Sequence, residues 1–204
     1  MLETLFSFAL ATSVLAISPG PDNIFVLMQS IVNGKKYGLA TVFGLITGCL
    51  IHTTLLAFGV AAIIKQSEYL FLGIKIFGTL YLLYLAYKVF KSDSQIVFSS
   101  ENIQKKTTKQ LFKQGFVMNV LNPKVSIFFL AFFPGFLFST TLNKVVQFYI
   151  LGGVFMLVSL VIFSGIAILA GSIAASVKEH RNIGVYLKWV QIVVFILVAI
   201  FILI

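Results

Sequence analysis

Two prolines interrupt a long apolar stretch near the start of the chain, and this interruption limits the possible folds more than any other feature. Pro19 and Pro21 lie within residues 2–32, which otherwise have the length and hydropathy of a membrane-spanning helix. Each interior proline removes a backbone donor and clashes with the preceding turn, which costs roughly 3 kcal/mol in an ordinary helix. At membrane depth the freed backbone groups need partners in neighbouring helices or in a water-lined cavity. We therefore expect an unwound segment, with one half-helix ending near Ile17 and another beginning near Asp22 or Asn23.

The side chains at this break favour a functional site. Residues 18–23 read Ser-Pro-Gly-Pro-Asp-Asn, so Gly20 stands beside the carboxylate of Asp22 and the amide of Asn23. An ionised carboxylate near the bilayer centre costs about 3 kcal/mol on insertion scales, so Asp22 should face the protein interior. The structural alternative is a proline kink in which Asp22 caps the restarting helix.

Composition defines the class of protein. The chain has 204 residues, of which 59% are hydrophobic and 10% charged, and its mean hydropathy is +1.05. These values exclude an ordinary soluble domain. Six apolar stretches of about 20 residues or more predict an all-α polytopic membrane protein with six transmembrane helices. The lysines stand between these stretches and form no continuous basic face, so the charge of +9 indicates membrane topology rather than nucleic-acid binding.

The second apolar segment carries a stripe of small residues that ends in a histidine. Gly44, Gly48 and His52 fall at positions i, i+4 and i+8, so they share one helical face that should pack against another helix. His52 is either a hydrogen-bonded interhelical histidine or a participant in proton movement. The second, third, fifth and sixth segments cover about residues 37–64, 69–90, 144–172 and 183–204.

The fourth apolar segment, about residues 114–138, repeats the logic of the first. It contains Asn119 and then Asn122, Pro123 and Lys124 in succession. Asparagine before proline suits an N-cap followed by the first residue of a restarting half-helix. Lys124 lies well inside the apolar span, where it serves function or extends its ammonium to a nearby interface.

The two prolines that precede charged residues suggest an internal duplication. Pro21 and Pro123 are 102 residues apart, half the length of the chain. We expect a first three-helix repeat at 1–91, a cytoplasmic basic loop at 92–113 and a second repeat at 114–204. Because three is odd, the repeats would have opposite orientations, with helices 1 and 4 broken at their prolines. Eleven of the 15 Lys and Arg residues fall at the first, third and fifth loops, which predicts cytoplasmic loops there and both termini on the outer face.

The two motifs together resemble those of a known family. Ser18-Pro19-Gly20-Pro21-Asp22 in the first segment and Asn122-Pro123-Lys124 in the fourth are similar to motifs of the LysE/RhtB family of bacterial amino-acid exporters. The chain length, the six segments and the basic central loop agree. The resemblance implies export of amino acids or closely related small metabolites across the bacterial cytoplasmic (inner) membrane, driven by the proton motive force and without a cofactor. It does not identify the amino acid.

The broken helices provide the candidate site. An amino-acid zwitterion would suit two converging half-helix N-termini, with Asp22 meeting the ammonium group or exchanging a proton, and with Lys124 pairing with Asp22 when substrate is absent. The expected partners are a small-molecule substrate, protons and the lipid bilayer, and a homo-oligomer is left open. The candidate substrate-binding or proton-coupling residues are Pro19, Gly20, Pro21, Asp22, Asn23, His52, Asn119, Asn122, Pro123 and Lys124.

Other functions are weighed against export of amino acids. The chain contains neither Gly-x-Ser-x-Gly nor His-Glu-x-x-His, so the sequence does not favour an enzyme. A resident metal would normally require more carboxylate, imidazole or thiolate ligands than the spans offer. An exporter of another small solute or cation, and a channel or scaffold without coupled transport, remain as alternatives.

Overall fold

The computed structural model describes residues 1–92, 106–179 and 183–203, and its regular structure there is entirely helical. Four helices are long and apolar enough to cross a membrane, and six spans result if each of two bent helix pairs counts as one. The predicted all-α polytopic class is thereby confirmed. The helices are α1 (Leu2–Ile17), α2 (Pro21–Asn33), α3 (Lys35–Leu55), α4 (Ala61–Gln66), α5 (Glu68–Lys91), α6 (Thr108–Val120), α7 (Pro123–Ile127), α8 (Lys144–Ile168), α9 (Ala170–Glu179) and α10 (Ile183–Leu203).

Both predicted helix breaks are present. The chain bends by 61° between α1 and α2, and by 47° between α6 and the helical segment Pro123–Phe136. The first half-helix ends at Ile17 as expected, and the second begins at Pro21, where a missing N–H costs nothing because it would have no helical partner. Both spans therefore divide beside the prolines that the sequence singled out.

The fourth span begins earlier than its apolar residues suggest. Helix α6 starts at Thr108, inside the expected loop 92–113, because Thr107 and Gln110 form a reciprocal capping box. Residues 93–105 of that loop lie outside the described residues. In the next expected polar loop, Lys178 and Glu179 still belong to α9, whereas His180 and Arg181 lie outside the described residues.

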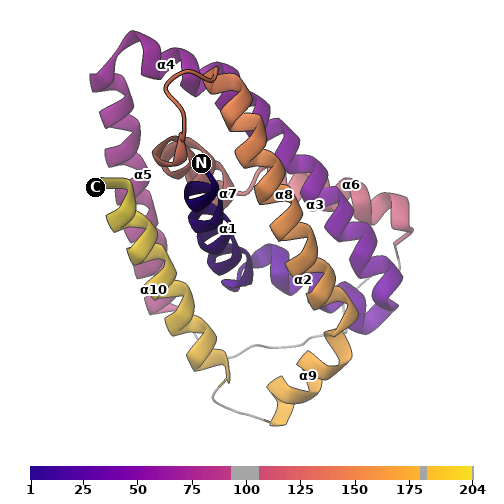
Figure 1. The fold of residues 1–204 in the computed structure, drawn as a ribbon. Helices are drawn as coiled ribbons and strands as arrows, with labels where there is room; N and C mark the ends of the chain where they lie inside the picture. Colours follow the sequence, from indigo (N-terminus) through magenta and orange to yellow (C-terminus); the bar gives the residue numbers. More distant parts are fainter. Residues whose placement is uncertain (93–105, 180–182, 204) are drawn as a thin grey trace.

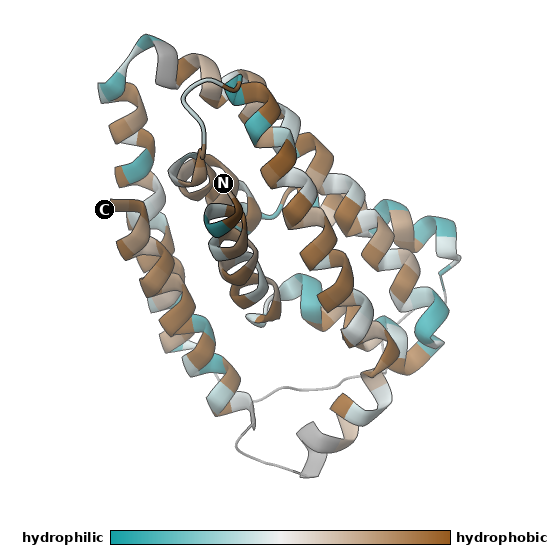
Figure 2. Ribbon diagram, viewed as in Figure 1, coloured by the Kyte–Doolittle hydropathy of each residue, from teal (hydrophilic) through white to brown (hydrophobic). Residues whose placement is uncertain are grey.

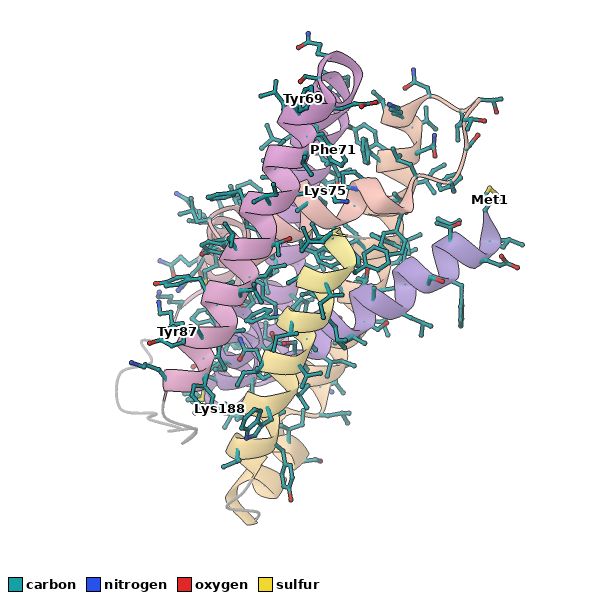
Figure 3. The ribbon with its side chains drawn as sticks, turned by 90° about the vertical axis from the view of Figure 1, so that its left-hand side faces the viewer. Met1, Tyr69, Phe71, Lys75, Tyr87 and Lys188 are labelled. Carbon is teal, nitrogen blue, oxygen red and sulfur yellow. The ribbon has the colours of Figure 1, made fainter. Side chains whose placement is uncertain are left out.

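The long helices form two groups with the broken first span between them (Figure 1). Helix α5 runs beside α10, whereas α3 packs against α6 and α8. Apolar residues cover most of each long helix, and polar residues gather near helix ends and in α2 (Figure 2). Figure 3 shows Lys188 of α10 close to the end of α5, where its Nζ donates to Ser92 O at 2.7 Å and lies 5.7 Å from the Phe90 ring.

Glycines allow the backbones of α3 and α6 to touch, as the stripe in the second segment predicts. A Cβ added to Gly44 would lie 2.0 Å from Phe112 O, and one added to Gly115 would lie 2.3 Å from Thr41 O. A Cβ on Gly48 would lie 2.7 Å from the side-chain oxygen of Asn119. The close packing of Gly48 on Asn119 therefore fixes the position of the Asn119 side chain along α3.

A cluster of phenylalanines fills the core beyond the second break. Phe129 stacks on Phe133 at 4.1 Å between ring centroids, and Phe8 of α1 meets Phe133 edge-on at 4.8 Å. The backbone widens to π-helical turns at Leu56–Val60 and at Phe128–Phe132, which begin about one helical turn after His52 and Lys124 respectively. Such turns are rare in α-helices and often accompany functional sites.

Candidate functional site

The first broken helix obtains its missing donors from the second. In a continuous helix the N–H of residue 19 would donate to Leu15 O, but Pro19 has no N–H. Lys124 takes this place: its Nζ donates to Leu15 O at 3.2 Å and to Ser18 O at 3.1 Å. Its Nζ also lies 5.6 Å from the centroid of the Phe195 ring. The ammonium therefore neutralises the negative end of α1 rather than extending to an interface.

Two amides complete the junction between the broken spans. Asn23 Nδ2 donates to Ala16 O at 2.7 Å, which satisfies another carbonyl at the end of α1. Asn122 Nδ2 donates to Asp22 Oδ2 at 2.7 Å, and Asn122 Oδ1 accepts from Lys124 N at 3.0 Å. Asn122 is therefore both the predicted N-cap of α7 and the link to the carboxylate of the other span.

The second broken helix obtains a donor from the first half of the chain. Pro123 has no N–H to donate to Asn119 O, so that carbonyl can accept from outside its own helix. His52 Nε2 lies 3.0 Å from Asn119 O. Because a carbonyl only accepts, the proton of the neutral ring is on Nε2. His52 is thus a hydrogen-bonded interhelical histidine in this conformation, and its contact mirrors that of Lys124.

Asp22 and Lys124 act through separate partners rather than as a direct ion pair. Within the described residues they form no contact of 4.0 Å or less, because Lys124 binds carbonyls and Asn122 binds Asp22. Asp22 is only 6% exposed and lies in the first turn of α2, where the helix dipole favours a negative charge. Each charge is therefore held near a helix end of opposite sign.

A small cavity of about 30 Å³ lies at this junction. That volume holds one or two water molecules but not an organic solute. Seven of the predicted site residues line the cavity: Gly20, Pro21, Asp22, Asn23, Asn119, Asn122 and Lys124. Pro19, Pro123 and His52 do not line it; the prolines create the breaks, and His52 contacts the backbone oxygen of Asn119.

Helix α8 adds lining residues that sequence reasoning did not assign to the site. Phe155, Ser159 and Phe163 line the cavity, and their spacing of four places them on one face of α8. A polar residue between two aromatic residues at helical spacing is the signal in the sequence that could identify this face of α8. Within the described ranges, no group of three or more His, Cys, Asp or Glu residues could hold a metal ion.

Comparisons with known proteins agree with this architecture. A model of the LysE type translocator family matches residues 13–204. The chain is 31% identical over 180 residues to a homoserine/homoserine lactone efflux protein of Salmonella typhimurium, which covers 88% of this chain and 86% of that protein. It is equally similar to the Salmonella typhi protein of the same description, and 30% identical over 146 residues to an uncharacterized membrane protein, YrhP, of Bacillus subtilis, covering 67% and 69%. No solved structure matches the chain significantly.

Proposed function

Since the chain belongs to the LysE type translocator family, we propose that it exports amino acids or closely related small metabolites and uses the proton motive force to do so. Family membership makes the chain a multi-pass membrane transporter of small solutes and not an enzyme. Beyond this, we propose the substrate class, the coupling to protons and the location in the cytoplasmic membrane.

One observation carries the proposal: the buried carboxylate of Asp22 and the half-buried side chain of Lys124 belong to two different broken helices and line the same cavity. Asp22 Oδ2 accepts from Asn122, and no described residue donates to Oδ1. A substrate ammonium can therefore bind Oδ1 while the substrate carboxylate binds Lys124. Asp22 is also the group that would bind a proton when the substrate ammonium leaves it.

The volume of the cavity implies that the site must open. With room for one or two water molecules, the cavity admits an amino acid only when the two broken helices separate. Separation withdraws Lys124 from Leu15 O and Ser18 O, and these carbonyls then need water or substrate as partners. An arrangement of inverted repeats that rock about a central site would provide this motion, and the reciprocal contacts of Lys124 and His52 support it.

Inside-out membrane vesicles provide the test. Vesicles that contain the chain should accumulate a labelled amino acid when their interior is acidified, and an uncoupler should abolish the accumulation. Accumulation of hydroxylated, branched-chain and basic amino acids should be measured in these vesicles and in vesicles that lack the chain. If inserted protein moves none of them, amino-acid export is wrong. Movement that only equilibrates, whatever the pH gradient, would indicate a channel instead.

We expect both termini on the outer face and the segment before α6 in the cytoplasm. The basic ends support this: α3 begins with Lys35, and α5 ends with Lys91 on the same side of the molecule (Figure 1), whereas α8 begins with Lys144 on the other. A cysteine added after the last residue should react with an impermeant reagent on intact cells. Lys109→Cys should react only after permeabilisation, and the native Cys49 is buried. The reverse labelling pattern would overturn this orientation.

Removing the first break should slow transport more than it reduces membrane insertion. In Pro19→Ala/Pro21→Ala the restored N–H groups can donate to Leu15 O and Ile17 O, so the helix can continue and displace Lys124. We expect the export rate per inserted molecule to fall about tenfold or more. A tenfold loss corresponds to roughly 1.4 kcal/mol of interaction free energy at the distorted site. Pro134→Ala removes a proline away from the cavity and serves as the control. A parental rate in the double variant would show that the break is only a kink.

A further inference from the structure

Ser159 in α8 carries one of three buried hydroxyl groups, with those of Thr12 and Ser18, that have no hydrogen-bond partner within the described residues. Hydroxyls inside helices usually donate to the carbonyl four residues earlier. Seven described Ser and Thr side chains do so: Ser13, Ser30, Thr41, Thr47, Thr53, Thr54 and Ser126. Ser159 is only 1% exposed, and of the three residues without a partner it alone lines the cavity at the junction of the broken helices.

The position of Ser159 explains what this hydroxyl can bind. It lines the same cavity as Asp22, Asn122 and Lys124. On the same face of α8, Phe155 and Phe163 lie one turn to either side and are buried. This wall of the cavity is therefore apolar except for one hydroxyl, whereas the charged groups belong to the broken helices. A buried hydroxyl without a partner costs free energy, which a bound donor or acceptor recovers.

We infer that Ser159 selects substrates whose side chain ends in a hydroxyl a short distance from the α-carbon, that is, small hydroxylated amino acids. This inference rests on the proposed export of amino acids. Asp22 and Lys124 hold the charged groups, Phe155 and Phe163 contact the methylenes, and the Ser159 hydroxyl bonds the terminal oxygen. An apolar wall alone discriminates poorly between a hydroxyl and a methyl group, whereas a site with a hydrogen-bonding group rejects the analogue that lacks the oxygen.

Homoserine and norvaline form the matched pair of probes, because they differ only in a terminal hydroxyl or methyl group. Wild-type protein in inside-out vesicles should transport homoserine in preference to norvaline. Ser159→Ala should reduce the homoserine-to-norvaline rate ratio by about three- to tenfold, the usual worth of one hydrogen bond. Norvaline transport should be kept or improved, because the alanine leaves an entirely apolar wall. Ser13→Ala, which removes a hydroxyl already bonded to Ala9 O, should leave the ratio unchanged.

The outcomes separate this inference from the proposed function. If both amino acids are transported and Ser159→Ala leaves their ratio unchanged, the assignment of Ser159 is wrong although amino-acid export stands. If wild-type protein transports no amino acid, the proposed function itself fails. Should Ser159→Ala not insert into the membrane, competition in wild-type vesicles decides: norvaline must inhibit export of labelled homoserine less well than unlabelled homoserine does. Equal inhibition by the two would overturn the inference.

Discussion

Replacing Lys124 with methionine is expected to reduce export by about 100-fold or more, because the closed junction loses roughly 3 kcal/mol. The variant leaves Leu15 O and Ser18 O without their donor and removes the positive charge nearest to Asp22. It also removes the group that we expect to bind the substrate carboxylate. The export rate in vesicles, normalised to inserted protein, is the measurement. Lys109→Met, which removes the same charge from an exposed position on α6, should keep the parental rate.

A double-mutant cycle tests whether the charges are coupled although they do not touch. Asp22→Asn keeps an oxygen that can accept from Asn122 but removes the charge. In Asp22→Asn/Lys124→Met the losses of unfolding free energy should not add, and the coupling should be about 1 to 3 kcal/mol. Thermal unfolding in detergent measures this free energy, while vesicle flux under a pH gradient should stay abolished. Additive stability losses, together with full flux in Asp22→Asn, would contradict the coupling and the proton role of Asp22.

Replacing Gly115 with alanine is expected to have the second large effect, through the packing of α3 on α6. The added methyl group would stand 2.3 Å from Thr41 O, a backbone atom that cannot rotate away. The two helices must therefore separate, at a cost of about 1 to 3 kcal/mol. Because Asn119 is carried by α6 and packs on Gly48, the cavity should change shape and export should fall with stability. The unfolding temperature in detergent and the vesicle flux should both decrease.

Gly153→Ala is the matched control for this prediction. Apart from its own stretch of helix, no atom of the described residues lies within 4 Å of a Cβ added at Gly153, although this residue too is within a long apolar helix. Alanine favours the helix over glycine by up to about 1 kcal/mol, so this variant should be as stable as the parent or more stable. Equal destabilisation by Gly115→Ala and Gly153→Ala would show that close packing between α3 and α6 does not explain the first result.

The positions of the breaks could be predicted from sequence because their cause is local. A proline lacks a donor wherever it stands, so Pro19 and Pro123 mark interruptions without knowledge of any neighbour. The spans follow from hydropathy for the same reason, since lipid selects long apolar segments one at a time. The early start of α6 is also encoded locally, in the capping box of Thr107 and Gln110, which lies outside the apolar residues that mark the span.

The partners across the junction could not be predicted in this way. Lys124 and Asp22 were expected to contact each other because their charges are opposite, yet the freed carbonyls of α1 lie closer to the ammonium, and Asn122 takes the carboxylate. A backbone carbonyl is present at every residue and leaves no mark in the sequence. Whether the Ser159 hydroxyl bonds its own helix or faces a cavity likewise depends on the neighbouring helices, so its role cannot be predicted from the sequence of α8 alone.

The exchange of donors between the two broken spans also dictates an order of events during synthesis. Leu15 precedes Lys124 by 109 residues, so the first span leaves the ribosome and meets the bilayer long before its donor exists. During that interval water is the available partner for the carbonyls of Leu15 and Ser18, and the break must stay hydrated. In a chain that stops before Lys124, the carbonyls of Leu15 and Ser18 would keep water as their partner. The fourth span thus supplies donors that the first span lacks for as long as the chain before Lys124 is alone in the membrane.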